Sequence, residues 1–165
     1  MPCLLSSVVF NLKILEITWS DTLTDVFSKE KRSEIMSRIG PKNTKPELII
    51  RRLVHSLGYR YRLHKKDLPG KPDLVFPKYR KVIFVHGCFW HGCEKCNRSK
   101  LPDTNYDFWN LKIRKTKDRD RRIYAELKKI GWDSLVLWQC EIKSLNTNRI
   151  SAEIIDFLGT ETASN

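Results

Sequence analysis

The segment Val85–Cys96, with the sequence VHGCFWHGCEKC, gathers three cysteines and two histidines within twelve residues. Cys88, Cys93 and Cys96 follow the spacing C-x4-C-x2-C, and thiolates at such spacings can converge on one tetrahedral Zn²⁺ ion. Cys140 is a candidate fourth ligand, and four protein ligands would make the site structural and not catalytic. Buried thiols without any metal are the alternative, above all for Cys140.

The two histidines of this segment, His86 and His91, are candidates for acid–base chemistry. A histidine titrates near neutral pH and can take a proton from an attacking water molecule. Asp73, in GKPDLVF, stands at the mouth of an apolar strand, where a carboxylate can bind Mg²⁺ together with water and phosphate oxygens. Each has an ordinary alternative: a turn aspartate after proline, and histidines that bind zinc or donate hydrogen bonds in the core.

Aromatic and basic residues accompany these groups. Phe89 and Trp90 lie inside the cysteine segment, and Trp109 opens a later, cation-rich stretch. Such aromatic side chains pack into a core, or they insert between base pairs at roughly a few kcal/mol per step. The later cations are candidate phosphate contacts, with a solvated helix face as the alternative; they are Lys112, Arg114, Lys115, Lys117, Arg119, Arg121 and Arg122. Asp120 is an isolated acid among them, either ion-paired or positioned to orient a histidine or a metal-bound water.

The composition indicates a polyanionic partner. The 165 residues suffice for one domain with one core, and 31 Lys and Arg against 19 Asp and Glu leave a net charge of +12. Such an excess favours binding to nucleic acid and does not define a fold. Five cysteines without an export signal favour a cytoplasmic, reducing compartment, and metal binding over disulfides.

The N-terminal residues are predicted to lie outside the core. They are apolar but interrupted by Lys13 and Glu16, and they lack the basic region and cleavage site of a secretory signal. They are also too interrupted to span a bilayer, so we expect no membrane association. The predicted organisation is an extension at 1–24, one domain at 25–159 and a tail at 160–165.

The elements that position these residues follow from periodicity and from turn residues. Lys29–Ile39 suits a short helix, and Thr44 is predicted to cap a second helix in which Glu47 closes a capping box and Gly58 ends the helix. Its predicted apolar face comprises Leu48, Ile49, Leu53 and Leu57. Further along we expect strands at 59–63, 73–76 and 81–86, a helix from 104 or 105 to 131, a strand from 133 to Cys140, and a helix at 151–159. This order predicts an α/β fold with a mixed central β-sheet, in which 81–86 is the central strand, flanked by helices.

The order of GKPDLVF and VIFVHG resembles the PD-(D/E)xK nuclease core, although the second strand lacks the acidic residue and the lysine of that core. From about Phe27 to Leu158 the chain resembles the very short patch repair (Vsr) family of DNA mismatch endonucleases, most specifically in GKPDLVF and VIFVHGCFWHGC. The resemblance implies a restriction-endonuclease-like variant of that core with a structural zinc site. It also implies an enzyme that nicks one strand of duplex DNA 5′ to the thymine of a T·G mismatch, which arises when 5-methylcytosine deaminates.

The resemblance assigns roles to individual residues. The family's metal-binding aspartate corresponds to Asp73, and a main-chain carbonyl ligand corresponds to Val85, where the family usually has threonine. His86 and His91 match the catalytic histidines, with His91 as the general base. Asp120 matches the acid that supports a catalytic histidine or metal-bound water. Glu47 matches a glutamate near the site, although a capping box explains it equally well.

The remaining matches concern zinc and DNA. The zinc ligands correspond to Cys88, Cys93, Cys96 and Cys140; some members have histidine at the second position, and the third lies one residue later here. Phe89, Trp90 and Trp109 match aromatics that intercalate beside the mismatch.

The implied activity is Mg²⁺-dependent hydrolysis by a monomer in the bacterial cytoplasm, associated with the nucleoid when it acts and with mismatch-repair proteins as candidate partners. Two alternatives stay open: a non-catalytic, zinc-braced DNA-binding protein, and a restriction endonuclease of the same superfamily.

Overall fold

The structure is a computed structural model that describes residues 31, 34, 43–63, 65–143 and 147–159. The chain's internal contacts divide it into two units, and all helices and strands with defined bounds belong to the second unit, Gly40–Asn165. The expectations for 1–24 and 160–165 lie outside the described residues. So does most of the predicted helix Lys29–Ile39, of which Lys31 and Glu34 are described as helical and form an ion pair at 2.9 Å.

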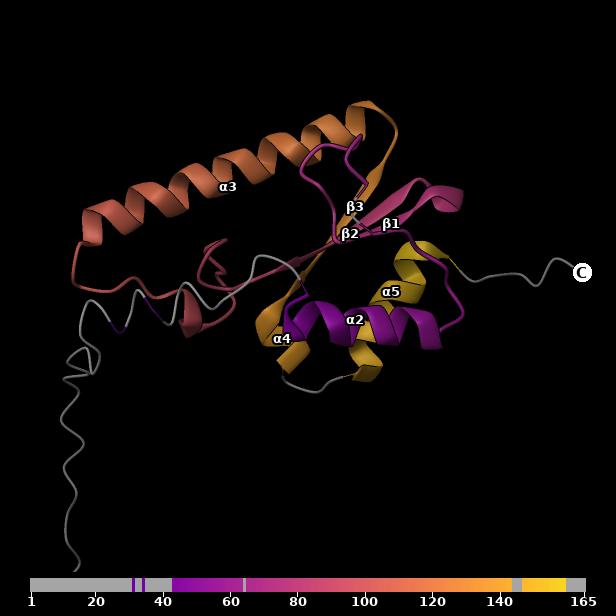
Figure 1. Cartoon of the computed structure of the whole chain (residues 1–165), viewed down its shortest axis with the longest axis horizontal. Coiled ribbons are helices and arrows are strands. Elements are labelled where there is room, and N and C mark those ends of the chain that lie inside the picture. Colours follow the sequence, from indigo (N-terminus) through magenta and orange to yellow (C-terminus); the bar gives the residue numbers. More distant parts are fainter. Residues whose placement is uncertain (1–30, 32–33, 35–42, 64, 144–146, 160–165) are drawn as a thin grey trace, which may run out of the picture. The chain divides into compact units, whose positions relative to one another are not determined.

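Three strands form one mixed sheet in the order β1-β2-β3 (Figure 1). The first strand, β1 (Leu74–Phe76), runs antiparallel to β2 (Lys81–His86), and β2 runs parallel to β3 (Asp133–Trp138). The central place of β2 was predicted, and its apolar run suits a strand that is covered on both faces. The strand expected at 59–63 does not form, because β1 offers only three residues and Arg62 makes a single isolated bridge to Val75.

Helix α2 (Lys45–Ser56) begins after Thr44 and is followed by Gly58 in the left-handed conformation, φ +90°, as the sequence predicted. The predicted apolar face is confirmed for Leu53 and Leu57, which pack against the core, and is wrong for Leu48 and Ile49, which are 38% and 39% exposed. Leu48 and Ile49 lie off the face that packs against the sheet, and the buried residues instead recur about one helical turn apart. They are Pro46, Glu47, Ile50, Arg51 and Val54.

The long helix α3 (Tyr106–Lys129) begins after Asn105, as expected. Cys140 does not end a strand: β3 stops at Trp138, and Cys140 lies in the short helix α4 (Gln139–Lys143). The closing helix α5 (Thr147–Leu158) starts before the predicted position, and short 3-10 turns occupy Pro77–Tyr79 and Asn97–Ser99. In the described part of the chain, no helix is long and apolar enough to cross a bilayer.

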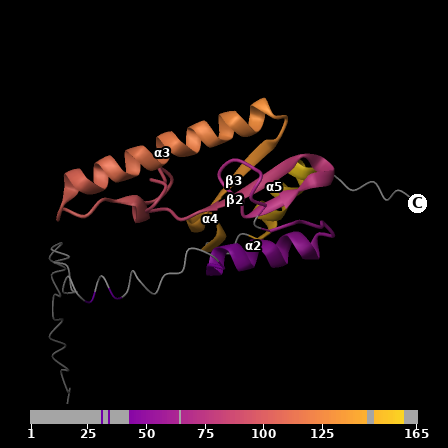
Figure 2. The same cartoon turned by 45° about the horizontal axis from the view of Figure 1, so that its top comes forward.

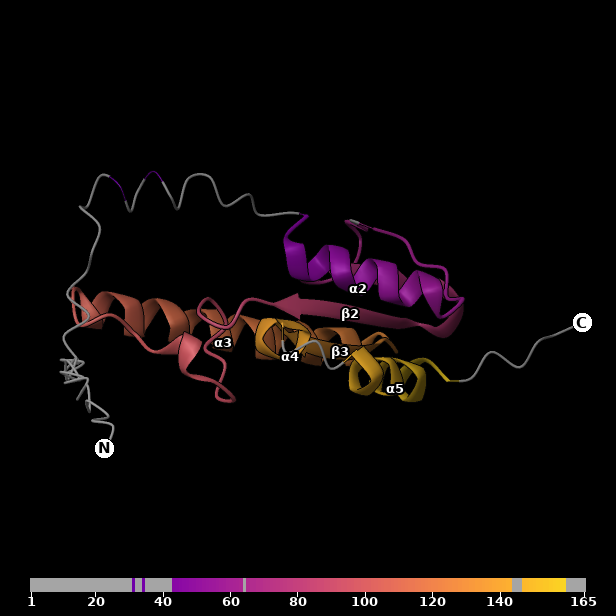
Figure 3. The ribbon, with the colours of Figure 1, turned by 90° about the horizontal axis from the view of Figure 1, so that it is seen from below.

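The helices cover both faces of the sheet, with α3 on one face and α2, α4 and α5 on the other (Figures 1 and 2). Figure 3, seen from the side of α2, α4 and α5, shows α2 and α5 next to each other in this layer, with β2 visible between them. Successive strand residues point to opposite faces, so Leu74 and Phe76 pack against α2 and α5, whereas Val75 packs with Leu127 of α3. The predicted α/β class and mixed sheet are confirmed, and the carboxyl end of β2 lies between the two helical layers.

Candidate active site and metal centre

Asp73 and Val85 meet at the carboxyl end of β2. The carboxylate oxygen Oδ2 of Asp73 accepts a hydrogen bond of 2.7 Å from the backbone N–H of Val85. Burial raises the pKa of Asp73 to about 6; the Val85 hydrogen bond opposes this shift, and the nearby charge of Glu47 adds to it. The antiparallel register of β1 and β2 thus joins the residues that were predicted to anchor a metal ion.

Glu47 lies beside this pair, but it does not close the predicted reciprocal capping box. The Thr44 hydroxyl donates to Glu47 Oε1 at 2.9 Å and makes no bond to a helix N–H, while the N–H of Asn43 donates to Oε2 at 3.0 Å. Arg51 Nη2 also donates to Oε2 at 3.0 Å, and both side chains of this ion pair are over nine-tenths buried. The sequence analysis missed Arg51, although its position four residues after Glu47 on one helix face is a usable signal.

His86 and His91 meet on the opposite face of the same strand end. Their rings stack with centroids 3.6 Å apart and planes inclined by 21°. His91 Nδ1 lies 2.6 Å from Oδ2 of Asp120, which α3 supplies, so the Nδ1–H donates to the carboxylate and leaves Nε2 able to accept a proton. The ligand atoms of these three side chains lie within 4.8 Å of one another, so the group could also hold a metal ion.

His86 is a neutral partner in this group. Burial, followed by the charge of His91, lowers the pKa of His86 to about 3. The hydroxyl of Tyr124 lies 3.3 Å from His86 Nε2, and burial raises the pKa of Tyr124, so the phenol stays protonated and donates this bond. Tyr124 follows Asp120 by four residues on α3, a spacing from which the sequence could have predicted its role.

The four cysteines of the predicted cluster come together between α4 and the cysteine loop, which we define as residues 87–100. Their sulfur atoms lie within 4.8 Å of one another, and Cys93 Sγ is 3.8 Å from Cys140 Sγ. Burial raises the pKa of Cys88 to about 12 and also raises the pKa of Cys140, so without a cation these thiols stay protonated. The Ser99 hydroxyl donates to the carbonyls of Cys93 and Cys96, which holds the loop in shape. This cluster could bind a metal ion.

The predicted DNA-inserting aromatics form one cluster at the start of α3. Phe89 lies with its ring centroid 5.2 Å from those of both Trp90 and Trp109, in edge-to-face geometry. The ammonium of Lys112 lies 5.5 Å from the Trp90 ring and 5.3 Å from the Trp109 ring. Trp90 is 37% exposed, and Phe108, which the sequence analysis did not single out, is 58% exposed and contacts Trp109. The cluster therefore presents aromatic surface to solvent.

The predicted DNA-contacting cations of α3 are exposed except for Lys117, which is half-buried, and they differ in their partners. Arg119 Nη2 donates to Oδ1 of Asp120 at 3.0 Å and so helps to position the acid that holds His91. Arg121 and Arg122 bond to the side chain and the carbonyl of Asp118. The side chains of Arg114 and Lys115 have no hydrogen-bond or ion-pair partner among the described residues.

Comparisons with known proteins identify the family of this chain. Residues 24–98 match the model of the family described as DNA mismatch endonuclease Vsr. The chain is 50% identical over 123 residues to the type II nicking enzyme V.XorIIP of Xanthomonas oryzae, an alignment that covers 74% of this chain and 90% of the relative. It is 44% identical over 139 residues to the type II nicking enzyme V.NmeAIP of Neisseria meningitidis, covering 81% and 99%.

A further relative carries the family's own name. The chain is 40% identical over 121 residues to the DNA mismatch endonuclease Vsr of Escherichia coli, covering 73% of this chain and 77% of the relative. The family match at residues 24–98 contains Asp73, the strand end, both histidines and the first three cysteines of the cluster. The chain therefore belongs to the Vsr family of DNA mismatch endonucleases and is a DNA endonuclease.

Proposed function

We propose that this endonuclease nicks one strand of duplex DNA 5′ to the thymine of a T·G mismatch, in a Mg²⁺-dependent reaction that leaves a 5′-phosphate. One observation carries the proposal: a half-buried carboxylate and a histidine–aspartate pair flank a single strand end. Asp73 bonds to the backbone of Val85, and the next residue, His86, stacks on His91. A group that can hold a cation and a group that can accept a proton thus belong to the same strand end, on its two faces.

His91 acts as the general base. Its Nδ1–H is held by Asp120 at 2.6 Å, so Nε2 faces the attacking water as an acceptor, and the carboxylate stabilises the imidazolium that forms. His86 does not compete for this proton because its pKa is lowered to about 3. The His86 ring stacks on His91 and instead holds the plane of the His91 ring.

Asp73 and the main-chain carbonyl of Val85 are the proposed Mg²⁺ ligands, with Glu47 close enough to affect the pKa of Asp73. Oxygen ligands of this kind suit a hard cation. When bound, Mg²⁺ would neutralise charge on the scissile phosphate and orient the leaving 3′-oxygen. The raised pKa of Asp73 supports the assignment, because the site disfavours an uncompensated negative charge.

Incubation with matched and T·G duplexes, with and without Mg²⁺, tests the proposal on a denaturing gel. We expect one nick, in the thymine strand of the T·G duplex, with Mg²⁺ present. Cleavage of both strands of matched DNA would indicate a restriction endonuclease instead, and binding without any cleavage would indicate a non-catalytic DNA-binding protein. Because scission of one strand needs one active site, we expect a monomer. We also expect the enzyme to act in the cytoplasm and to cooperate with mismatch-repair proteins.

The cysteine cluster is proposed to hold a structural Zn²⁺ ion. Zn–S bonds of about 2.3 Å at the tetrahedral angle separate two sulfurs by about 3.8 Å, and Cys93 Sγ and Cys140 Sγ are 3.8 Å apart. Bound zinc would also deprotonate the buried thiols and remove a group of uncompensated donors.

Replacing Cys88 by Ser is expected to lower bound zinc from about one ion per chain to well below one and to lower the melting temperature by about 10 °C, because metal-binding energy is folding energy here. Metal analysis and thermal melting measure both effects. Cys3→Ser, which alters a cysteine without an assigned role, serves as the control and should change neither. Zinc that binds but leaves the melting temperature unchanged on removal would contradict a structural role.

The aromatic cluster is proposed to wedge into the base stack at the mismatch. A T·G wobble pair is easier to open than a Watson–Crick pair, so a rigid aromatic edge gains more from a mismatched site. Trp90→Ala should lower affinity for T·G duplex about tenfold while changing affinity for matched duplex less than threefold, as measured by fluorescence anisotropy. Leu111, a 55% exposed side chain of α3, provides the control substitution Leu111→Ala. Equal losses on both duplexes for Trp90→Ala would count against a wedge.

A further inference from the structure

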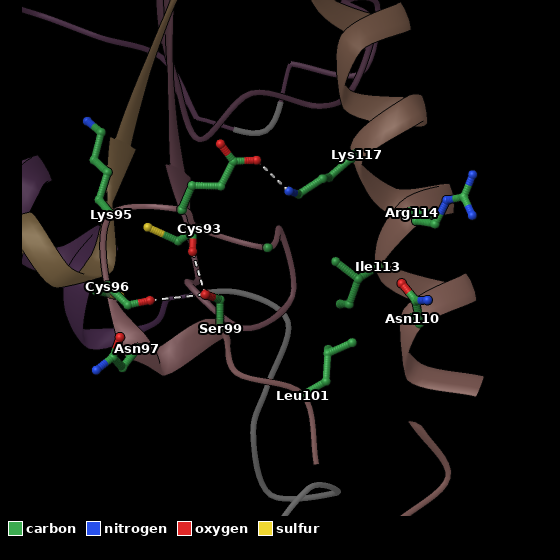
Figure 4. Close-up of a pocket in the computed structure, with 12 residues that line it drawn as sticks. Cys93, Lys95, Cys96, Asn97, Ser99, Leu101, Asn110, Ile113, Arg114 and Lys117 are labelled. Atoms are coloured by element: carbon green, nitrogen blue, oxygen red, sulfur yellow. Dashed lines mark hydrogen bonds and ion pairs between the residues drawn. The ribbon is translucent and has the colours of Figure 1, made fainter. Parts of the chain in front are cut away.

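Two cavities adjoin between the cysteine loop and α3. One, of about 350 Å³, is lined by His86, His91 and Asp120 and belongs to the candidate active site. The other, of about 490 Å³, opens between the loop and the first half of α3 (Figure 4). Because they share wall residues, the two cavities lie next to each other, and the second extends along the cysteine loop; the shared residues are Gly92, Glu94, Lys95 and Lys117.

Lys117 is held in this shared wall. Figure 4 shows its side chain reaching from α3 toward the loop, whereas Arg114 turns away from the loop. A Cβ atom at Gly92 would lie 2.5 Å from Cε of Lys117, and Gly92 has a φ of +60°, so glycine leaves the room that the lysine stem occupies. Because Gly92 directly follows His91, the packing delivers the ammonium next to the proposed general base.

The Lys117 ammonium is paired with a carboxylate that is easily displaced. Its Nζ donates to Glu94 Oε1 at 2.9 Å, and the Glu94 side chain is 87% exposed. Within the described part of the chain, no other group bonds to that carboxylate. An exposed ion pair of this kind adds little to stability because water screens it, whereas a phosphate oxygen accepts a strong, charge-assisted hydrogen bond from an ammonium.

We propose that Lys117 binds a DNA backbone phosphate that neighbours the scissile one. In the DNA-free enzyme the Lys117 ammonium is ion-paired with Glu94, and the phosphate displaces this carboxylate when DNA binds. The inference rests on the proposed function, since it places the DNA strand across the active-site cavity. Glu94 then lowers affinity for all DNA slightly, because every phosphate that enters must displace it. The DNA strand would then run from His91 along the cysteine loop, through the cavity between this loop and α3.

A scan with neutralised phosphates tests the phosphate contact. In T·G duplexes, each phosphate from two positions 5′ to two positions 3′ of the nick site is replaced in turn by an uncharged methylphosphonate. Binding is measured without added Mg²⁺. For the wild-type chain, we expect one neighbouring position at which neutralisation weakens binding about fivefold to tenfold. In Lys117→Gln, which keeps the aliphatic stem beside Gly92, that position should lose its effect while the others keep theirs.

A double-mutant cycle tests the role of Glu94. Glu94→Gln should tighten DNA binding about twofold to fivefold in the wild-type background and should have no effect in the Lys117→Gln background. Lys128→Gln removes one charge from α3 about 16 Å further along the helix, and should leave the methylphosphonate pattern unchanged. An equal effect of Glu94→Gln in both backgrounds would mean that Glu94 only repels DNA by its charge. That result would contradict the proposed competition between Glu94 and phosphate for Lys117.

The two proposals fail in different ways. If the wild-type scan shows a sensitive position that Lys117→Gln leaves unchanged, the Lys117 assignment is wrong and the mismatch-directed activity stands. If the wild-type chain neither nicks T·G duplex nor shows any sensitive position, the proposed function itself is wrong.

Discussion

Replacing Asp73 by Asn is expected to lower the nicking rate on T·G duplex at least about a thousandfold, equivalent to roughly 4 kcal/mol of transition-state stabilisation. An amide can still accept the hydrogen bond from the Val85 N–H at 2.7 Å, but it lacks the charge that binds Mg²⁺. Single-turnover nicking measures the loss. Asp67→Asn, which changes an exposed aspartate ion-paired to Lys65, is the matched control and should nick at the wild-type rate.

The same substitution is expected to stabilise the metal-free protein above pH 6. The pKa of Asp73 is about 6 in the folded chain and 3.8 in the reference state, so the folded state binds the proton more tightly. The stabilising effect of the proton is complete below about pH 3.8 and is lost as the pH rises through 6. At pH 8, ionised Asp73 therefore destabilises the fold by up to about 3 kcal/mol.

Thermal melting without divalent cations tests this pH dependence. Asp73→Asn should melt several degrees higher than wild type at pH 8, with the difference vanishing near pH 4, and added Mg²⁺ should stabilise only the wild type. Loss of activity together with a lower melting temperature at pH 8 would instead assign Asp73 a structural role.

Replacing His91 by Gln is expected to lower the nicking rate about 10²-fold to 10⁴-fold while leaving DNA affinity within about twofold. Glutamine can still donate a hydrogen bond to Asp120, but its amide cannot accept the proton of the attacking water. His55→Gln, at an exposed position near the end of α2, provides the control. A rate within tenfold of wild type for His91→Gln would exclude His91 as the general base.

Asp120→Asn separates orientation of the base from metal binding. Asparagine presents either an oxygen or an amide N–H to His91 Nδ1, so the tautomer with a free Nε2 loses its charged partner, and the rate should fall with little change in Mn²⁺ affinity. A parallel loss of Mn²⁺ affinity, measured calorimetrically, would instead favour the metal site that the His86, His91 and Asp120 side chains could form.

The sequence alone determined the features that depend on short-range rules. The start of α2 after Thr44, the central strand Lys81–His86 and the long helix after Asn105 follow from proline in the first helical turn, β-branched residues and turn chemistry, which act over a few residues. The spacing of Cys88, Cys93 and Cys96 indicated a metal-binding loop for the same reason. Cys140 was predicted as the fourth ligand, and the structure places its sulfur close enough to the other three for all four to bind one ion.

Only the tertiary structure decided the contacts between elements. The buried face of α2 carries the Glu47–Arg51 ion pair in place of Leu48 and Ile49, because packing against the sheet selects the face and not hydropathy alone. Arg119 bonds to Asp120, although its place in a cation-rich helix had predicted a contact with DNA. His91 meets an acid 29 residues away only because α3 lies over β2. Such pairings depend on how two surfaces pack in space, and no local spacing encodes that geometry.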